Sequence, residues 1–204
     1  MNNMDFDFEK EIKKTQESDN DTLWKELEQR CLCCTECELH KTRTNVVFGC
    51  GNKKASVMFI GEAPGESEDL QATPFVGASG KLLDKYFDAV GLPRESVYIA
   101  NILKCRPPKN RDPLPKEEEA CINYLRKQLM LIKPKIVVCL GRIAAKKLIS
   151  EDFKITSEHG VWFKKGGYDM CAVYHPSALL RDLQKREDML KDMWSIAKKA
   201  KELM

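Results

Sequence analysis

The chain has 204 residues and a mass of 23.4 kDa, a length typical of one compact domain. Hydrophobic residues make up 43% of it and charged residues 32%, a balance that excludes wholesale disorder. No apolar run approaches the ~18–20 residues of a membrane span, and the N-terminus MNNMDFDFEKEIKK lacks a signal peptide's apolar core, so we expect a cytoplasmic protein.

Charge is unevenly distributed along the chain. Residues 1–30 carry nine acidic and five basic side chains, whereas the remainder carries 22 acidic and 29 basic ones. A net charge of +7 on the body suits a polyanionic partner such as nucleic acid. A solvated lysine-rich surface would show the same surplus, so charge alone leaves both interpretations open.

The chain divides into an acidic N-terminal segment and one folded region. Residues 1–20 are polar, show no apolar periodicity after Phe8, and are predicted to form a flexible arm. Residues 21–204 are predicted to form a single domain. Its expected helices begin near Asp21 and then cover 79–92, 115–134, 141–149 and 182–203.

Four short apolar runs alternate with these helices. They are rich in Val, Ile, Phe and Tyr, as buried parallel strands are, and occupy residues 56–61, 96–101, 135–141 and 170–175. The alternation predicts an α/β fold, a three-layer sandwich with a central, largely parallel four-stranded sheet flanked by helices.

Polar signals follow three of the four predicted strands. The first strand runs into GEAPGESED (61–69), the second ends at Asn101, and the fourth ends at His175, followed by Pro and Ser. Ligands of open parallel sheets bind outside the carboxyl ends of the strands. We therefore expect the three signals to converge on one pocket.

Nine cysteines in a chain without an export signal require an explanation, because disulfides are rare in a reducing cytosol. Cys139 and Cys171 lie inside strand-like runs and are predicted to be core residues, and Cys50 has no partner pattern.

The other six cysteines favour a metal site over structural thiols, although their number alone leaves both open: Cys31, Cys33, Cys34, Cys37, Cys105 and Cys121. A C-x2-C pair and two distant cysteines can supply the four thiolates of a [4Fe-4S] cluster. Zinc would accept the same four sulfurs, so the spacing does not choose between the two metals.

Six motifs in register resemble the family 4 uracil-DNA glycosylases, iron–sulfur members of the uracil-DNA glycosylase superfamily. The resemblance runs from about residue 24 to 200. Its motifs are CTECELHKTRTNVVFG (34–49), GEAPGESED (61–69), PFVGASGKLL (74–83), YIANILKCRPPKNRDP (98–113), EEEACINYL (117–125) and YHPSALLR (174–181).

The resemblance implies a [4Fe-4S] cofactor and a uracil pocket. The implied cluster ligands are Cys34, Cys37, Cys105 and Cys121, which leaves Cys31 and Cys33 as additional cysteines. The implied pocket residues are Gly61, Glu62 and Ala63 as lining, Phe75 as the stacking ring, Asn101 as the side chain that reads uracil, and His175 of the second motif.

These implied roles agree with the chemistry of base excision. The nucleotide must be flipped out of the duplex, and an Asn amide can pair with both N3–H and O4 of uracil. His175 is expected to stabilise the uracil anion. Glu68 is expected to position the attacking water because Ala63 replaces the Asp of other members, with Glu66 second, and Glu62 is the candidate that excludes thymine.

The expected partner is uracil-containing DNA, single- or double-stranded, bound by a monomer. Four basic residues in the loop 104–111 suit contacts with the phosphate backbone. The predicted DNA-binding residues are Arg106, Lys109, Arg111, Ser177 and Arg181.

Three other functions compete with a monofunctional uracil-DNA glycosylase. A superfamily variant that traps uracil covalently carries an Arg-rich loop before the second motif, whereas residues 157–169 are short and contain no Arg. A non-catalytic iron–sulfur DNA-binding protein associated with replication is the second alternative. A nucleotide-phosphate hydrolase is the weakest, because GEAPGE lacks the Lys-Ser/Thr of a phosphate loop.

Overall fold

The computed structural model describes residues 20–203, so the arm predicted for residues 1–20 lies outside the described residues except for its last one. The strands in chain order are β1 (Cys50–Gly51), β2 (Val57–Gly61), β3 (Tyr98–Asn101), β4 (Ile136–Leu140), β5 (Phe163–Lys165) and β6 (Tyr168–Val173). The helices are α2 (Asn20–Leu32), α3 (Glu66–Gln71), α4 (Ala78–Val90), α5 (Pro115–Ile132), α6 (Arg142–Leu148), α7 (Ile155–Glu158), α8 (Pro176–Arg181) and α9 (Lys185–Leu203). Three short 3-10 turns, η1 (Glu38–Lys41), η2 (Arg94–Ser96) and η3 (Pro108–Asn110), lie in the connections.

Within residues 20–203 the strands form one six-stranded sheet in the order β1-β3-β2-β4-β6-β5. The four central strands run parallel, and they are the four strands that the apolar runs predict. The edge strands β1 and β5 pair antiparallel with β3 and β6. They add to the predicted four-stranded sheet, and the sequence does not reveal them because strands of two and three residues are too short to form an apolar run.

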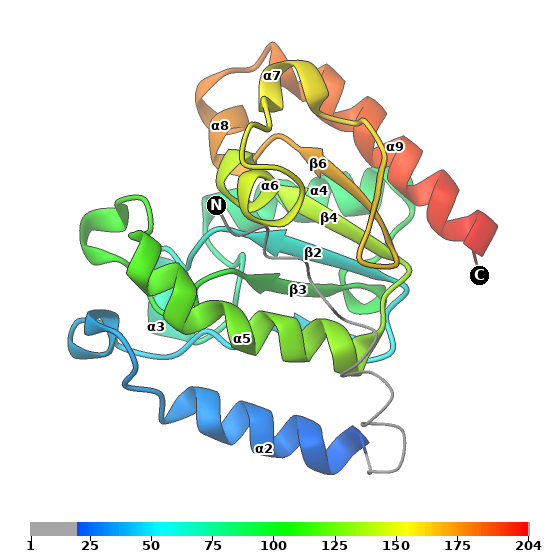
Figure 1. Ribbon diagram of the computed structural model, residues 1–204. Coiled ribbons are helices and arrows are strands. Elements are labelled where there is room, and N and C mark those ends of the chain that lie inside the picture. Colours follow the sequence, from blue (N-terminus) through cyan, green and yellow to red (C-terminus); the bar gives the residue numbers. More distant parts are fainter. Residues whose placement is uncertain (1–19, 204) are drawn as a thin grey trace.

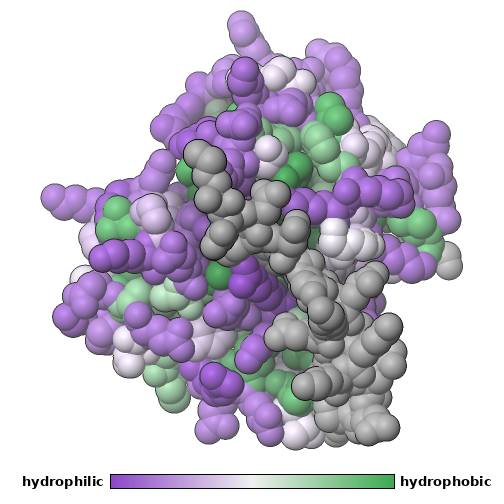
Figure 2. Space-filling view, in the orientation of Figure 1, coloured by the Kyte–Doolittle hydropathy of each residue, from purple (hydrophilic) through white to green (hydrophobic). Residues whose placement is uncertain are grey.

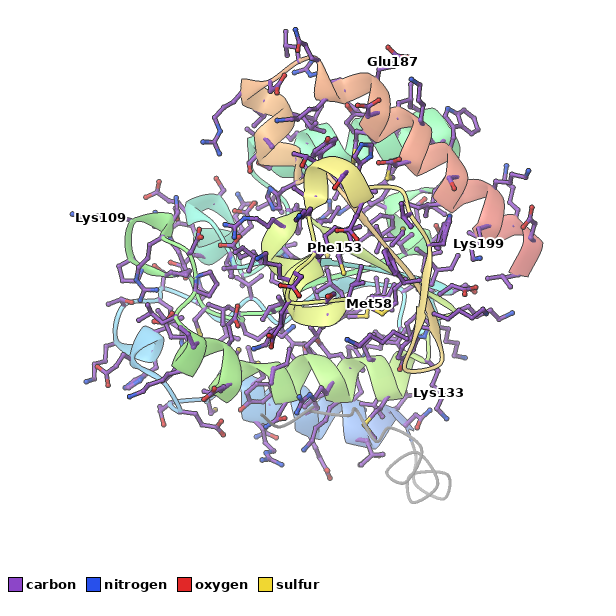
Figure 3. The ribbon with its side chains drawn as sticks, turned by 45° about the horizontal axis from the view of Figure 1, so that its top comes forward. Met58, Lys109, Lys133, Phe153, Glu187 and Lys199 are labelled. Carbon is purple, nitrogen blue, oxygen red and sulfur yellow. The ribbon has the colours of Figure 1, made fainter. Side chains whose placement is uncertain are left out.

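Alternate side chains along the parallel strands enter two separate cores. In β2, Met58 and Ile60 belong to the core under α2, α5 and α6, whereas Val57 and Phe59 belong to the core under α4 and α9. In Figure 1, α5 lies between α2 and the sheet, and α9 lies on the opposite side of the sheet. Figure 3 shows Met58 in the interior of the molecule. The predicted three-layer α/β sandwich is confirmed.

Three helix boundaries follow from local chemistry. Pro115 begins α5, where its missing N–H costs nothing, and the Glu117 carboxylate accepts the backbone N–H of Leu114. The helix ends at Ile132, and Lys133 caps it in a left-handed conformation before Pro134. Gly91 ends α4 with a φ of 64°, a conformation that glycine adopts without steric cost.

Polar side chains dominate the part of the surface that can be seen. Figure 2 shows hydrophilic residues over most of the uncovered area of one face, with small separate apolar groups. Among residues 20–203, no helix combines the length and apolar character needed to cross a bilayer.

Candidate active site and cysteine cluster

A cavity of about 590 Å³ opens at the carboxyl ends of the parallel strands. The predicted pocket residues that line it come from the loop after β2, helix α3, the loop between α3 and α4, the end of β3 and the segment after β6. They are Glu62, Ala63, Glu68, Phe75, Asn101 and His175. The structure therefore brings together the three polar signals that follow the strands, as their positions in the sequence predict.

Gly61 lies where Phe75 and Asn101, the predicted stacking and reading side chains, meet. It pairs with Asn101 across the ends of β2 and β3. A Cβ atom at Gly61 would clash with Oδ1 of Asn101 and lie 2.7 Å from Cζ of Phe75. Only glycine leaves room for both side chains at this position.

The Asn101 amide is buried and incompletely bonded. The residue is 2% exposed, and its Oδ1 has no hydrogen-bond partner among the described residues. A buried acceptor without a partner costs about 1–3 kcal/mol. Such an acceptor beside an aromatic ring can receive a donor from a planar ligand.

Glu68 holds the loop that carries Phe75. Its Oε1 accepts the backbone N–H groups of Val76 at 2.9 Å and Gly77 at 2.8 Å, directly before α4 begins. The carboxylate therefore lies at the N-terminus of a 13-residue helix, where negative charge is favoured. Glu68 also lines the cavity and interacts electrostatically with His175.

Arg94 holds the same loop from the other side. Its Nη2 donates to the carbonyl oxygen of Pro74 at 2.6 Å, and its Nη1 donates to Asp84 Oδ1 at 2.7 Å. Phe75 itself has a φ of 53°, the left-handed region that is costly for a bulky residue. Gly80 allows the carbonyl of Phe75 to approach, because a Cβ there would clash with it.

His175 presents a neutral imidazole to the cavity. Its Nδ1 accepts the Ser177 backbone N–H at 3.2 Å and lies 2.8 Å from Ser177 Oγ. Burial lowers the pKa of His175 to about 4, with Arg181 adding to the effect and Glu68 opposing it. Because Nδ1 is the acceptor, the neutral ring carries its proton on Nε2.

Glu62 titrates at an unusual pH for a carboxylic acid. Burial raises its pKa to about 7, the charges of Asp112 and Glu118 add to this effect, and Arg142 opposes it. Arg142 also lies 3.2 Å from Asp112 and lines the cavity. Sequence analysis missed Arg142, although it follows directly after the third parallel strand.

The predicted DNA-binding residues lie in different environments. Lys109 is exposed at the tip of the 104–111 loop and extends away from the body (Figure 3). Arg106 pairs with Glu66 at 3.5 Å, and Arg181 lines the cavity. The remaining two are engaged within the protein, since Arg111 makes a bidentate pair with Glu117 and Ser177 bonds His175.

One residue of this basic loop does not face solvent. Lys104 is 1% exposed, so the expectation that all four basic residues of 104–111 suit backbone contacts is wrong for this one. The sequence places it directly before Cys105, and the fold buries that position between the sheet and α5.

Five cysteines line a second, small cavity between α2, the η1 loop, the end of β3 and α5. They are the four predicted ligands and one additional residue: Cys34, Cys37, Cys105, Cys121 and Cys31. Arg43 Nη1 donates to Cys105 Sγ at 3.2 Å, and the Lys104 backbone N–H donates to Cys121 Sγ at 3.2 Å. Cys33 is exposed, whereas Cys139 and Cys171 are buried, as predicted for core residues.

The chemistry of this cavity fits an iron–sulfur cluster. Among residues 20–203, no group of three or more His, Cys, Asp or Glu side chains is placed to hold a single metal ion. Four cysteine thiolates can each bind a separate iron of a [4Fe-4S] cluster, and zinc would accept the same four sulfurs. Arg43 and Lys104 place positive charge beside these cysteines, which would favour the thiolates of a bound cluster.

We expect Glu62→Gln to change how stability depends on pH. The folded-state pKa is raised from 4.5 to about 7, so the folded protein holds this proton more tightly than the unfolded chain. The contribution of the Glu62 proton to the free energy of unfolding is fully present below pH 4.5 and is lost as the pH rises to about 7. The free energy of unfolding of the wild type, measured in urea, should therefore fall relative to Glu62→Gln over this interval; parallel curves would contradict the assignment.

We expect Glu68→Ala to release the Phe75 loop. Loss of the carboxylate leaves the Val76 and Gly77 amides without their acceptor, at a cost of about 1 kcal/mol, typical of a lost helix cap. Amide hydrogen exchange should accelerate at these two positions. In the matched control, Glu68→Gln, the amide oxygen still accepts and exchange should stay close to wild type.

Comparison with known proteins identifies the family. The profile of the uracil DNA glycosylase superfamily matches residues 48–198. Three proteins named type-4 uracil-DNA glycosylase are similar: from Archaeoglobus fulgidus, 48% identical over 81% of this chain and 87% of the relative; from Sulfurisphaera tokodaii, 42% over 83% and 81%; and from Thermotoga maritima, 43% over 76% and 81%. The chain therefore belongs to the uracil-DNA glycosylase superfamily, in its type-4 branch.

Proposed function

We propose that this protein is a monofunctional DNA repair glycosylase that excises uracil from DNA by hydrolysing the N-glycosidic bond, leaving an abasic site. The observation that carries the proposal is the buried, unpaired Oδ1 of Asn101, which faces Gly61 beside Phe75 in the cavity at the strand ends. The similarity to proteins named type-4 uracil-DNA glycosylase supports the same activity.

Asn101 and Phe75 would select the base. The free Oδ1 of Asn101 accepts N3–H of uracil and its amide donates to O4, while Phe75 stacks on the ring. Cytosine has no N3–H and carries an amino group in place of O4, so both contacts would be mismatched. Gly61 and Ala63 leave room for the flipped base, and Glu62 is the candidate that excludes the 5-methyl group of thymine.

His175 would stabilise the leaving group. As the glycosidic bond stretches, negative charge develops on uracil O2. The neutral His175 ring has its proton on Nε2, because Ser177 donates to Nδ1, so it can donate a hydrogen bond to this oxygen. The same contact fixes the ring before substrate enters.

Glu68 is the favoured residue for positioning the attacking water. It lines the cavity, and Oε1 is occupied by two backbone N–H groups, which leaves Oε2 for a water molecule. Glu66, the other carboxylate considered, is exposed and pairs with Arg106. Glu68 would thus both orient water and hold the Phe75 loop.

Phosphate contacts would hold DNA, single- or double-stranded, across the cavity. Lys109 suits this role by its exposure, and Arg181 and Arg142 suit it by their position on the cavity wall. Arg106 is partly buried and would have to leave Glu66 to reach phosphate. Arg111 and Ser177 also line the cavity, where Arg111 is paired with Glu117 and Ser177 is bonded to His175. We propose that the protein acts as a monomer and is cytoplasmic.

The cysteine cavity would hold a [4Fe-4S] cluster through Cys34, Cys37, Cys105 and Cys121. Bound there, the cluster would join three segments of the chain rigidly and would carry negative charge. The four ligands come from the segment after α2, the loop after β3 and helix α5. They would therefore tie the N-terminal helix to the loop that follows Asn101.

Base release from an oligonucleotide with one U·G pair, read as alkali-dependent strand scission, tests the activity. Asn101→Ala should weaken binding and discrimination against cytosine, and His175→Ala should lower kcat by about 10²–10³-fold, the usual effect of a lost donor to developing charge. Folded, cluster-loaded wild type that releases no uracil would overturn the proposal.

The cofactor is tested by iron and sulfide analysis and by visible absorption of anaerobically purified protein. Cys105→Ser and Cys121→Ser should lower the cluster content and the thermal midpoint together, because the thiolates cross-link separate segments. Cys33→Ser, at an exposed cysteine, is the matched control and should retain wild-type iron. Stoichiometric zinc without iron would contradict the assignment.

A further inference from the structure

Lys104 is a buried cation that none of the roles above explains. It is 1% exposed and is the one fully buried lysine or arginine among residues 20–203. Its position is three residues beyond Asn101 and directly before Cys105. It therefore lies in the short segment that joins the candidate uracil site to the cysteine cavity.

Two hydrogen bonds hold the ammonium group of Lys104 next to the candidate uracil site. Nζ donates to the backbone carbonyl of Asn101 at 3.0 Å and to Oε1 of Gln128 at 2.7 Å. Gln128, on α5, is itself held because its Nε2 donates to the Phe48 carbonyl and to the Tyr98 hydroxyl. The Asn101 backbone is thereby attached to the helix that carries Cys121.

The other side of Lys104 faces sulfur. Cys31, Cys105 and Cys121 interact electrostatically with its ammonium group, and its backbone N–H donates to Cys121 Sγ. Lys104 takes part in none of the ion pairs between side chains of residues 20–203. A buried cation without a counter-charge is strongly unfavourable, so the thiolates of a cluster are its natural partner.

We infer that Lys104 is a positioning residue that couples the charge of the cluster to the geometry of uracil recognition. The negative cluster holds the ammonium group in the core, and the ammonium group holds the Asn101 carbonyl at the end of β3. Asn101 Oδ1 then stays at Gly61 and Phe75 without a protein partner. The inference rests on the proposed function, because uracil is the ligand that Asn101 would read.

Arg43 provides a matched control within the same cavity. It donates to Cys105 Sγ, so it also places positive charge beside the cluster, but it makes no bond to Asn101 or Gln128. Replacing either cation with methionine should lower the reduction potential of the cluster, since lost positive charge favours the oxidised form. Only the Lys104 variant should change the uracil site.

The experiment compares cluster-loaded wild type, Lys104→Met and Arg43→Met. For each, it measures the reduction potential and the inhibition constant of free uracil in the U·G cleavage assay. In Lys104→Met, the potential should fall and the inhibition constant should rise roughly tenfold, the effect of a lost charge-assisted hydrogen bond. In Arg43→Met, the potential should fall while the inhibition constant stays at the wild-type value.

A third variant, Lys104→Gln, separates charge from hydrogen bonding. It keeps a donor for the Asn101 carbonyl, so it should lower the potential but recover part of the uracil affinity lost in Lys104→Met. An unchanged inhibition constant in both Lys104 variants would overturn the inference, as would an equal rise in Arg43→Met. Absence of uracil release by the wild type would instead overturn the proposed function, so the two failures are distinguishable.

Discussion

The candidate site depends on one pairing, that of Gly61 with Asn101 at the ends of β2 and β3. The parallel register places the two residues side by side, and the missing side chain of Gly61 leaves a space that Asn101 Oδ1 and the Phe75 ring share. A larger residue would displace the amide, the ring or both. The other candidate groups can act on a ligand only because the space beside Gly61 is free of a side chain. The surrounding loops hold Asn101 and Phe75 in place around that space.

The backbone of Phe75 is strained, and contacts from two other side chains hold it in place. Its left-handed backbone is costly for an aromatic residue, so its loop needs support from both sides. Glu68 binds the amides that follow it and Arg94 binds the carbonyl that precedes it. Strain of this kind is typical of sites in which a ligand contact has to be set before the ligand arrives. Substitution of Glu68 would therefore change the position of the ring and, if Glu68 also orients water as proposed, the attacking water as well.

Regular periodicity made the centre of this fold predictable. Four apolar runs predict the parallel strands, and the polar residues that follow three of them predict the pocket, because strand ends converge in any parallel sheet. Arg94, Arg142 and Lys104 could not be assigned in this way. Each depends on a partner that is distant in the sequence: Pro74 for Arg94, Asp112 for Arg142 and Gln128 for Lys104, which are 20, 30 and 24 positions away. Local sequence cannot distinguish a buried lysine from its exposed neighbours in a basic loop.

The ionisable groups of the cavity are arranged to limit charge where an anion would form. His175 is neutral because burial lowers its pKa to about 4, and Glu62 holds its proton up to about pH 7. The Glu68 carboxylate is bound by two amides at the start of α4, where a negative charge is favoured. A leaving uracil anion would then meet a neutral donor in a desolvated site, in which hydrogen bonds are stronger than in water. The positive charge that accompanies this chemistry lies at the rim, on Arg142 and Arg181, where it suits phosphate rather than the base.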